Sequence, residues 1–134
     1  MKKKTGIGVE GKIHKQFASI IIQYEGYKRL KADWWSYDAS GEKRNLTTAS
    51  LLKAKGLRGG KPDYEFISVR DGLAYYLYIE FKRPKVKGCS AGKQSDNQKK
   101  FQDIFNTASN CNYYICYSVK EAIDILIANK FLEI

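Results

Sequence analysis

Two strand-like runs, residues 63–69 and 74–82, are joined by Asp71-Gly72, and this pairing restricts the possible folds more than any other feature. Asp-Gly is a strong signal for a two-residue hairpin loop, so we expect the two runs to pair antiparallel. If Asp71 and Gly72 form the loop, residues whose numbers sum to 143 lie opposite each other. The sequence therefore predicts that Asp63 lies directly opposite Glu80.

The predicted register brings two carboxylates together at one end of the hairpin. Opposite residues on antiparallel strands share a face, with Cβ atoms about 4.5 to 5.5 Å apart, so Asp63 and Glu80 would repel each other. Such a pair is tolerated if one acid keeps its proton or if a cation lies between the two, and hard divalent cations prefer oxygen ligands. We expect a metal here, unless a one-residue bulge turns one carboxylate to the other face.

Side chains alternate along a strand, so Lys82 shares the face of Glu80. The other face is predicted to be core and carries Tyr75, Leu77, Ile79 and Phe81. A surface Glu/Lys pair at the end of an amphipathic strand is the simpler interpretation. The functional interpretation is favoured because Pro62-Asp63 follows Gly59-Gly60, which permits close backbone approach, and because the register independently pairs Asp63 with Glu80.

The 134 residues suit one domain, 1–134, without an internal boundary. The longest apolar run, 17–22, is too short to span a bilayer, and no apolar segment follows Lys2-Lys3-Lys4. We therefore expect a soluble, unsecreted, cytoplasmic protein without a membrane contact. The three cysteines have no Cys-x-x-Cys spacing and the chain has one histidine, which argues against a structural zinc site. We interpret Cys111 and Cys116 as reduced core thiols and Cys89 as a loop thiol.

A net charge of +10 suits a partner with a phosphate backbone. Solubility or non-specific polyanion binding would explain the charge equally well. Loop 83–93, next to the predicted carboxylate pair, is either a solvated segment or a clamp for a phosphate backbone, and its position favours the clamp. The basic residues predicted to bind DNA are Arg58, Lys61, Arg83, Lys85, Lys87 and Lys93.

Two helices are predicted to carry a polar residue at the inward-facing end of an apolar stripe. Glu10 does so in helix 9–24, where it could equally be an ordinary first-turn acid. Gln98 does so in a helix that starts at Ser95 or Asp96, and a buried amide needs a polar partner. For the single histidine, His14, a partly buried or surface position is the better interpretation.

The remaining elements are a strand at 33–38, a turn at 39–44, a helix at 47–55, a strand at 113–117 and a helix opened by a capping box from Ser118 to Glu121. The order is helix, strand, helix, strand, strand, helix, strand, helix. This order predicts an α/β fold with a mixed β-sheet flanked by helices, in which a crossover helix leads to the fourth strand.

Four segments together resemble the VRR-NUC domains of the PD-(D/E)xK nuclease superfamily, in particular the small stand-alone members often encoded by phages. They are Glu10 in the first helix, the Gly-x-Pro-Asp segment at 60–63, the Glu-x-Lys at 80–82 and the helix glutamine Gln98. The resemblance covers most of the chain and implies a restriction-endonuclease-like fold. Residues 38–41 depart from it, because many members carry an Asn-containing turn there.

The resemblance implies a deoxyribonuclease that depends on Mg²⁺ or Mn²⁺ and leaves a 5′-phosphate and a 3′-hydroxyl. Asp63, Glu80 and the main-chain carbonyl of Phe81 would bind the metal, and Lys82 would orient the attacking water. Glu10 would hold a metal-bound water or a second ion, and Gln98 would position Lys82 or the metal shell. The alternatives are a basic nucleic-acid-binding module without catalysis and a monomeric nicking or flap nuclease.

The resemblance also implies a homodimer that acts on branched DNA as a Holliday-junction resolvase does, since two-fold symmetry would supply two sites for two incisions. Apolar residues near the chain ends and in the first strand exceed what the predicted stripes need. They could form an interface or could cap the core, and they are Trp34, Trp35, Phe131, Leu132 and Ile134.

Overall fold

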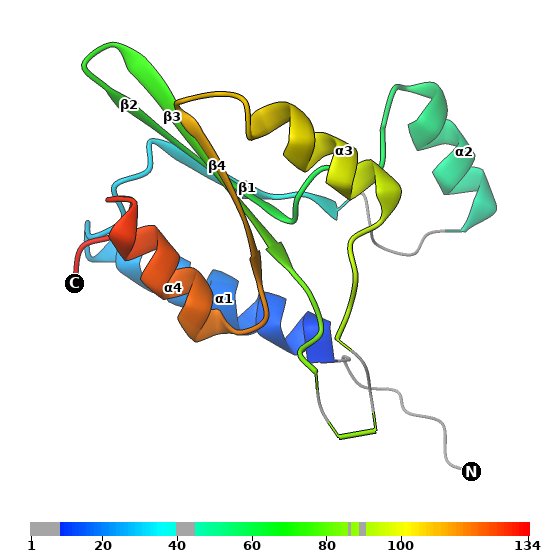
Figure 1. Cartoon of the computed structure of the whole chain (residues 1–134), viewed down its shortest axis with the longest axis horizontal. Helices are drawn as coiled ribbons and strands as arrows, with labels where there is room; N and C mark the ends of the chain where they lie inside the picture. The colour runs from blue at the N-terminus through cyan, green and yellow to red at the C-terminus, as the bar shows by residue number, and fades with distance from the viewer. Residues whose placement is uncertain (1–8, 40–44, 86, 89–90) are drawn as a thin grey trace. The chain divides into compact units, whose positions relative to one another are not determined.

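The computed structural model describes residues 9–39, 45–85, 87–88 and 91–134 (Figure 1). Its helices and strands follow in the predicted order: α1 (Val9–Gly26), β1 (Trp34–Tyr37), α2 (Leu46–Ala54), β2 (Tyr64–Arg70), β3 (Leu73–Phe81), α3 (Asp96–Phe105), β4 (Cys111–Cys116) and α4 (Val119–Ala128). The predicted turn around Gly41 and the loop thiol Cys89 lie outside the described residues. None of the described helices combines the length and apolarity needed to cross a membrane.

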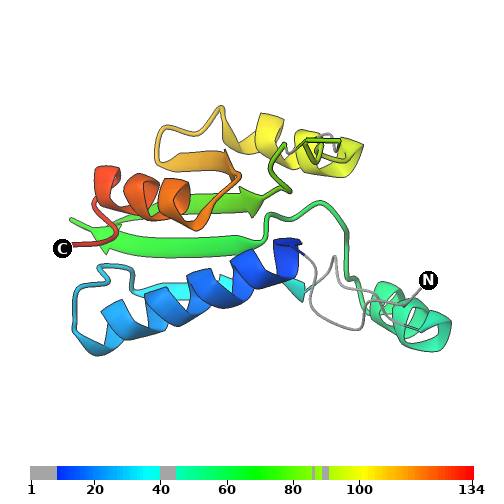
Figure 2. The ribbon, with the colours of Figure 1, turned by 90° about the horizontal axis from the view of Figure 1, so that it is seen from below.

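The β2–β3 hairpin, green in Figure 2, has the predicted antiparallel register. Pairs run from Arg70 opposite Leu73 to Tyr64 opposite Ile79, so every pair sums to 143 and no bulge interrupts β2. Asp71 and Gly72 both have positive φ, 52° and 79°, as a tight two-residue turn with this twist requires. The local chemistry of Asp-Gly therefore fixes the register of the central strands.

The four strands form one sheet in the order β1-β2-β3-β4. β1 pairs antiparallel with β2. Tyr76 donates to the carbonyl of Asn110 and Lys82 to that of Cys116, both at 2.9 Å, so β3 and β4 keep a constant offset of 34 residues and run parallel. The α/β fold with a mixed sheet is therefore confirmed, with α3 as the crossover helix to β4.

The described chain groups into two compact units that interleave along the sequence. The first comprises Met1–Ala32, Phe81–Gly92 and Ile115–Ile134, and the second comprises Asp33–Glu80 and Lys93–Tyr114. β3 passes from the second unit to the first at Glu80–Phe81, and β4 does so between Tyr114 and Ile115.

The core of the first unit forms where α1 and α4 touch and where α1 meets the end of β3. Phe17 and Ile21 of α1 are fully buried, and the ring of Phe17 packs edge-on against Phe81 at 5.1 Å between centroids. Phe131 and Leu132 are buried as well, and Leu132 bridges to Leu30. These two residues near the chain end therefore complete the core, as one of the two sequence interpretations held, and Ile134 stays exposed.

The core of the second unit is an aromatic cluster between α3 and the sheet. Tyr78 of β3 packs against Phe101 at 5.1 Å and Phe105 at 5.4 Å, and Phe101 lies 6.1 Å from Tyr113 of β4. Residues Leu77 to Phe81 of β3 are all buried, so this half of the strand is not the amphipathic strand that the simpler interpretation of the sequence assumed. By contrast, α2 carries no buried residue.

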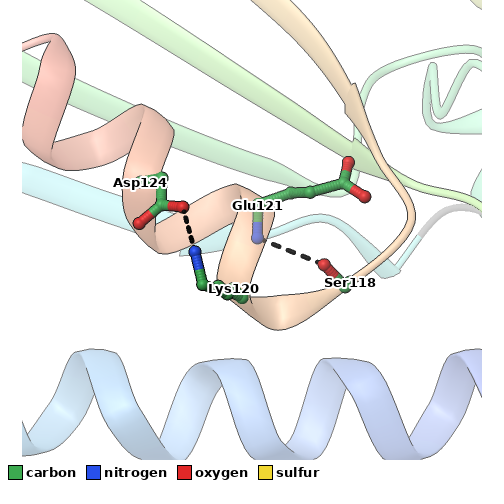
Figure 3. Close-up of polar contacts among 4 residues, drawn as sticks. All are labelled: Ser118, Lys120, Glu121 and Asp124. Atoms are coloured by element: carbon green, nitrogen blue, oxygen red, sulfur yellow. Dashed lines mark hydrogen bonds and ion pairs between the residues drawn. The ribbon is translucent and has the colours of Figure 1, made fainter.

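Helices α3 and α4 begin at serine caps. Ser95 and Gln98 form a full capping box at α3. Ser118 caps α4 by accepting from the N–H of Glu121 at 3.2 Å, and Lys120 pairs with Asp124 at 2.9 Å (Figure 3). The prediction of a capping box here needs a correction, because the Glu121 carboxylate accepts from the N–H of Tyr117 at 3.2 Å, one residue before the cap.

Candidate functional site

Glu80 is the acid around which the candidate site is built. It lies next to the end of β3 and is only 1% exposed. The side-chain amide of Gln98 donates from Nε2 to Glu80 Oε1 at 2.7 Å, so Gln98 has the polar partner that its position predicted. A buried carboxylate is costly unless hydrogen bonds or opposite charge compensate it, and this short bond supplies part of that compensation. The surface Glu/Lys interpretation does not hold for Glu80.

The start of α3 holds the Gln98 side chain at both ends. Its Oε1 accepts from the N–H of Ser95 at 2.9 Å while its Nε2 reaches Glu80. Glu80 shares a strand face with Tyr78, which packs against Phe101 one turn after Gln98. The aromatic cluster thus holds α3 against β3. The helix cap fixes the orientation of the Gln98 side-chain amide.

Asp63 immediately precedes β2 and is half-buried. Its main-chain carbonyl accepts from the N–H of Asp38 at 2.8 Å, which anchors it to the segment after β1. The last observed pair of the hairpin is Tyr64 with Ile79, so Asp63 directly precedes one member of that pair and Glu80 directly follows the other. The observed register ends one pair short of the two acids, so the direct pairing of Asp63 with Glu80 stays a prediction.

The pKa of Tyr113 in β4 is affected by both acids. The pKa of its phenol is raised to about 12, mainly by burial; the hydrogen bond from Gln94 acts to lower that pKa, and the negative charges of Glu80 and Asp63 act to raise it. The amide of Gln94 donates to the phenol oxygen at 3.3 Å. Since the charges of Asp63 and Glu80 both act on this one hydroxyl, Tyr113 lies near the two acids. Its alternating, inward position in β4 was the only sequence signal for it.

The first unit holds the other predicted residues, Glu10, Phe81 and Lys82. Glu10 Oε1 accepts from the N–H of Arg83 at 2.9 Å. Gly92 donates to the Arg83 carbonyl at 2.9 Å, and a Cβ added at Gly92 would lie 3.5 Å from Lys82 Cβ and 3.6 Å from Glu10 Oε1. Glu10 and the Lys82 Cβ therefore both lie close to Gly92, where an added Cβ would be tight only against the Arg83 nitrogen, at 3.1 Å.

The prediction that Glu10 faces inward was wrong. The residue is exposed, and among the α1 residues whose burial is described the first buried one is Phe17, two turns further on. The first turn of α1 instead reaches the chain that leaves β3, where Glu10 accepts the Arg83 N–H. A role for Glu10 as an ordinary first-turn acid remains compatible with this position.

The six predicted DNA-binding cations are all exposed: Arg58, Lys61, Arg83, Lys85, Lys87 and Lys93. Lys61 forms an ion pair with Glu65 at 3.8 Å, which offsets part of its charge. Arg58 donates to the carbonyls of Lys53 and Leu57 at 3.5 and 3.4 Å, so its guanidinium lies close to the end of α2. Sequence reasoning missed Lys100 and Asn97 of α3, which lie beside Arg58 and Gly60.

The donor set fits a hard divalent cation better than a borderline one. Among the residues that the structure describes, no group of three or more His, Cys, Asp or Glu side chains is arranged to hold a metal. The predicted ligands include only two side chains, the carboxylates of Asp63 and Glu80. Mg²⁺ is commonly bound by one or two carboxylates and keeps several waters, so two acids and a main-chain carbonyl are a suitable set.

Comparison of the chain with protein-family models, with curated proteins and with solved structures found no match.

Proposed function

We propose that the protein hydrolyses phosphodiester bonds of DNA with Mg²⁺ or Mn²⁺. The observation that carries the proposal is the buried Glu80, which Gln98 holds and which directly follows the last register pair of the hairpin, while a second acid, Asp63, directly precedes that pair. Two neighbouring carboxylates, one of them buried, cost stability, and such arrangements concentrate at functional sites. In a chain with a net charge of +10, this local acidic pair is where a cation and a phosphate backbone could meet.

In this proposal Asp63, Glu80 and the carbonyl of Phe81, the next residue in the chain, hold the cation. When bound, the metal polarises a phosphoryl oxygen and lowers the pKa of a water. Gln98 keeps the Glu80 carboxylate in one orientation through its bond to Oε1. The Lys82 amine orients the attacking water and offsets charge in the transition state, and Glu10 holds the Arg83 main chain where the strand ends.

The resemblance to VRR-NUC domains supports branched DNA as the substrate and a homodimer as the active form. Of the apolar residues considered for an interface, Trp34 is 60% exposed and Ile134 is exposed, whereas Phe131 and Leu132 are buried and contribute nothing to it. Light scattering at micromolar concentration should give about twice the chain mass. A monomer that still nicks branched DNA would replace the resolvase by a monomeric nicking or flap nuclease.

The second candidate function is nucleic-acid binding without catalysis. The six exposed cations favour it, because they would bind a phosphate backbone whether or not the carboxylates hold a metal. In this alternative the Glu80–Gln98 bond serves only to join α3 to the sheet.

An incubation with supercoiled plasmid and with a four-way junction separates the two functions. The nuclease should convert both substrates in Mn²⁺ or Mg²⁺ and neither in EDTA. A protein that shifts both DNAs in a gel but leaves them intact at every metal concentration is the non-catalytic module.

A further inference from the structure

A cavity of about 300 Å³ lies in the second unit between the Gly59-Gly60 loop and α3. Its described lining has two cations and no acid, together with an aromatic and an aliphatic side chain. The lining residues are Arg58, Gly59, Gly60, Asn97, Lys100, Phe101 and Ile104. The volume is at the small end of the usual range for ligand sites, about 300 to 1,000 Å³, so the cavity suits one nucleotide unit rather than a duplex.

The wall of this cavity is held in place by direct packing of the loop on α3. Gly60 has a φ of +103°, and a Cβ there would lie 2.7 Å from Asn97 Cβ and 2.8 Å from its carbonyl atoms. Only glycine fits this position, on steric grounds and on backbone grounds. Gly59, in contrast, has only the Asn97 amide nitrogen at 4.0 Å, so its main chain stays open toward the cavity.

The side chains that line the cavity combine two positive charges with an apolar surface. Phe101 stacks on Phe105 at 4.5 Å between centroids, so its ring is held by the aromatic cluster. Ile104 is 57% exposed although it is a large aliphatic residue. Arg58 and Lys100 are both exposed cations beside it. An unstacked base or sugar would cover the apolar atoms while its phosphate meets the cations, which is how proteins bind single-stranded nucleic acid.

The cavity also adjoins the candidate site along the chain. Gly60 lies three residues before Asp63, and Asn97 immediately precedes Gln98, which binds Glu80. The lining of the cavity and the two carboxylates therefore come from adjoining segments of the chain within the same unit.

We infer that this cavity, here called the Arg58–Lys100 pocket and lined as given above, binds one unpaired nucleotide of a DNA strand. The inference rests on the proposed function, because the nucleotide would belong to the strand that the Asp63–Glu80 site cuts. It adds a substrate feature, since DNA with an unpaired or unstacked nucleotide would bind better than a continuous duplex.

The test is fluorescence anisotropy in EDTA with a labelled single-stranded oligonucleotide and with the blunt duplex of the same sequence. EDTA prevents hydrolysis, so the measurement reports binding alone. Lys100→Ala is compared with Lys99→Ala, an exposed lysine on the same helix outside the lining. Ile104→Ser is compared with Ile22→Ser on α1, which has a matched exposure of 56%. Far-UV circular dichroism checks that each variant is folded.

Lys100→Ala should weaken single-strand binding about three- to tenfold and reduce the salt slope by about one, more than Lys99→Ala does. Ile104→Ser should weaken single-strand binding about fivefold or more with the salt slope unchanged, and Ile22→Ser should have no effect. Both losses should be smaller for the duplex. Equal effects of each variant and its control, or no single-strand binding by the wild-type protein, would overturn the inference.

The outcomes keep the pocket and the proposed function apart. If the wild-type protein cleaves DNA in Mn²⁺ but the pocket variants bind like their controls, the pocket inference fails and the nuclease stands. If the pocket variants lose single-strand binding while no metal supports cleavage, the pocket stands and the nuclease fails.

Discussion

Replacing Gln98 by alanine tests whether α3 and the buried acid are coupled as the structure shows. The substitution removes the 2.7 Å bond to Glu80, which is only 1% exposed. A hydrogen bond to a charged group contributes about 1.5 to 3 kcal/mol. It also removes the reciprocal half of the capping box at Ser95, and a helix cap is worth about 0.5 to 2 kcal/mol in total. We expect the free energy of unfolding to fall by about 2 to 4 kcal/mol.

Gln102→Ala provides a matched control on the same helix. Gln102 accepts one neutral hydrogen bond, from Gln94 at 3.0 Å, so its loss should cost about 0.5 to 1.5 kcal/mol. Urea unfolding followed by circular dichroism measures both variants against the wild type. Because the Gln102 bond involves no charge, the midpoint of Gln98→Ala should shift at least twice as far. Equal shifts would refute the view that Gln98 compensates a buried carboxylate.

Three further predictions follow from the packing and from the exposed charges. Gly60→Ala should lower the melting temperature, because the added Cβ would approach α3 within 2.8 Å at a φ of +103°. Gly59→Ala serves as the control and should leave the melting temperature unchanged. Identical melting curves for the two variants would contradict this packing. Burial raises the pKa of Cys116 from 9.0 to about 12. The unfolded thiol therefore ionises at a lower pH than the native one, and its contribution to the free energy of unfolding should decline from about pH 9 up to pH 12, by at most about 1.4 kcal/mol per pH unit. Urea midpoints of the wild type and of Cys116→Ala between pH 8 and pH 10.5 measure this decline, and parallel curves would exclude it. The double variant Lys85→Ala and Lys87→Ala should weaken DNA binding uniformly across sequences and lower the salt slope by about two, while an unchanged slope would leave the loop as a solvated segment.

The hairpin and the cap of α3 could be predicted because short-range chemistry determines them. Asp71-Gly72 selects a two-residue turn, and this turn determines the register up to the pair of Tyr64 with Ile79 without any knowledge of the rest of the fold. In the same way, Ser95 followed by Gln98 three residues later is a helix-start signal that needs no tertiary information.

Features that depend on packing between distant segments could not be predicted. The burial of Glu80 follows from α3 lying on β3 through Tyr78 and Phe101, a contact that periodicity does not reveal. The apolar stripe of α1 suggested an inward Glu10, but Glu10 lies about two turns before the buried Phe17, so its side chain is exposed. The contact of Gly60 with α3 is likewise tertiary, because the sequence shows a flexible glycine pair and not what it packs against.

The most direct test of the metal-dependent cleavage is the nicking rate of supercoiled plasmid in Mn²⁺ for the wild type, Asp63→Asn and Asp103→Asn. Asp63→Asn keeps the shape of the side chain but removes the carboxylate that is proposed to bind the metal together with Glu80, whereas Asp103 is an exposed acid of α3 and serves as the charge-matched control. The account predicts that Asp103→Asn cleaves like the wild type, and that Asp63→Asn loses cleavage while it binds DNA as well or slightly better. Cleavage by Asp63→Asn at the wild-type rate would contradict it.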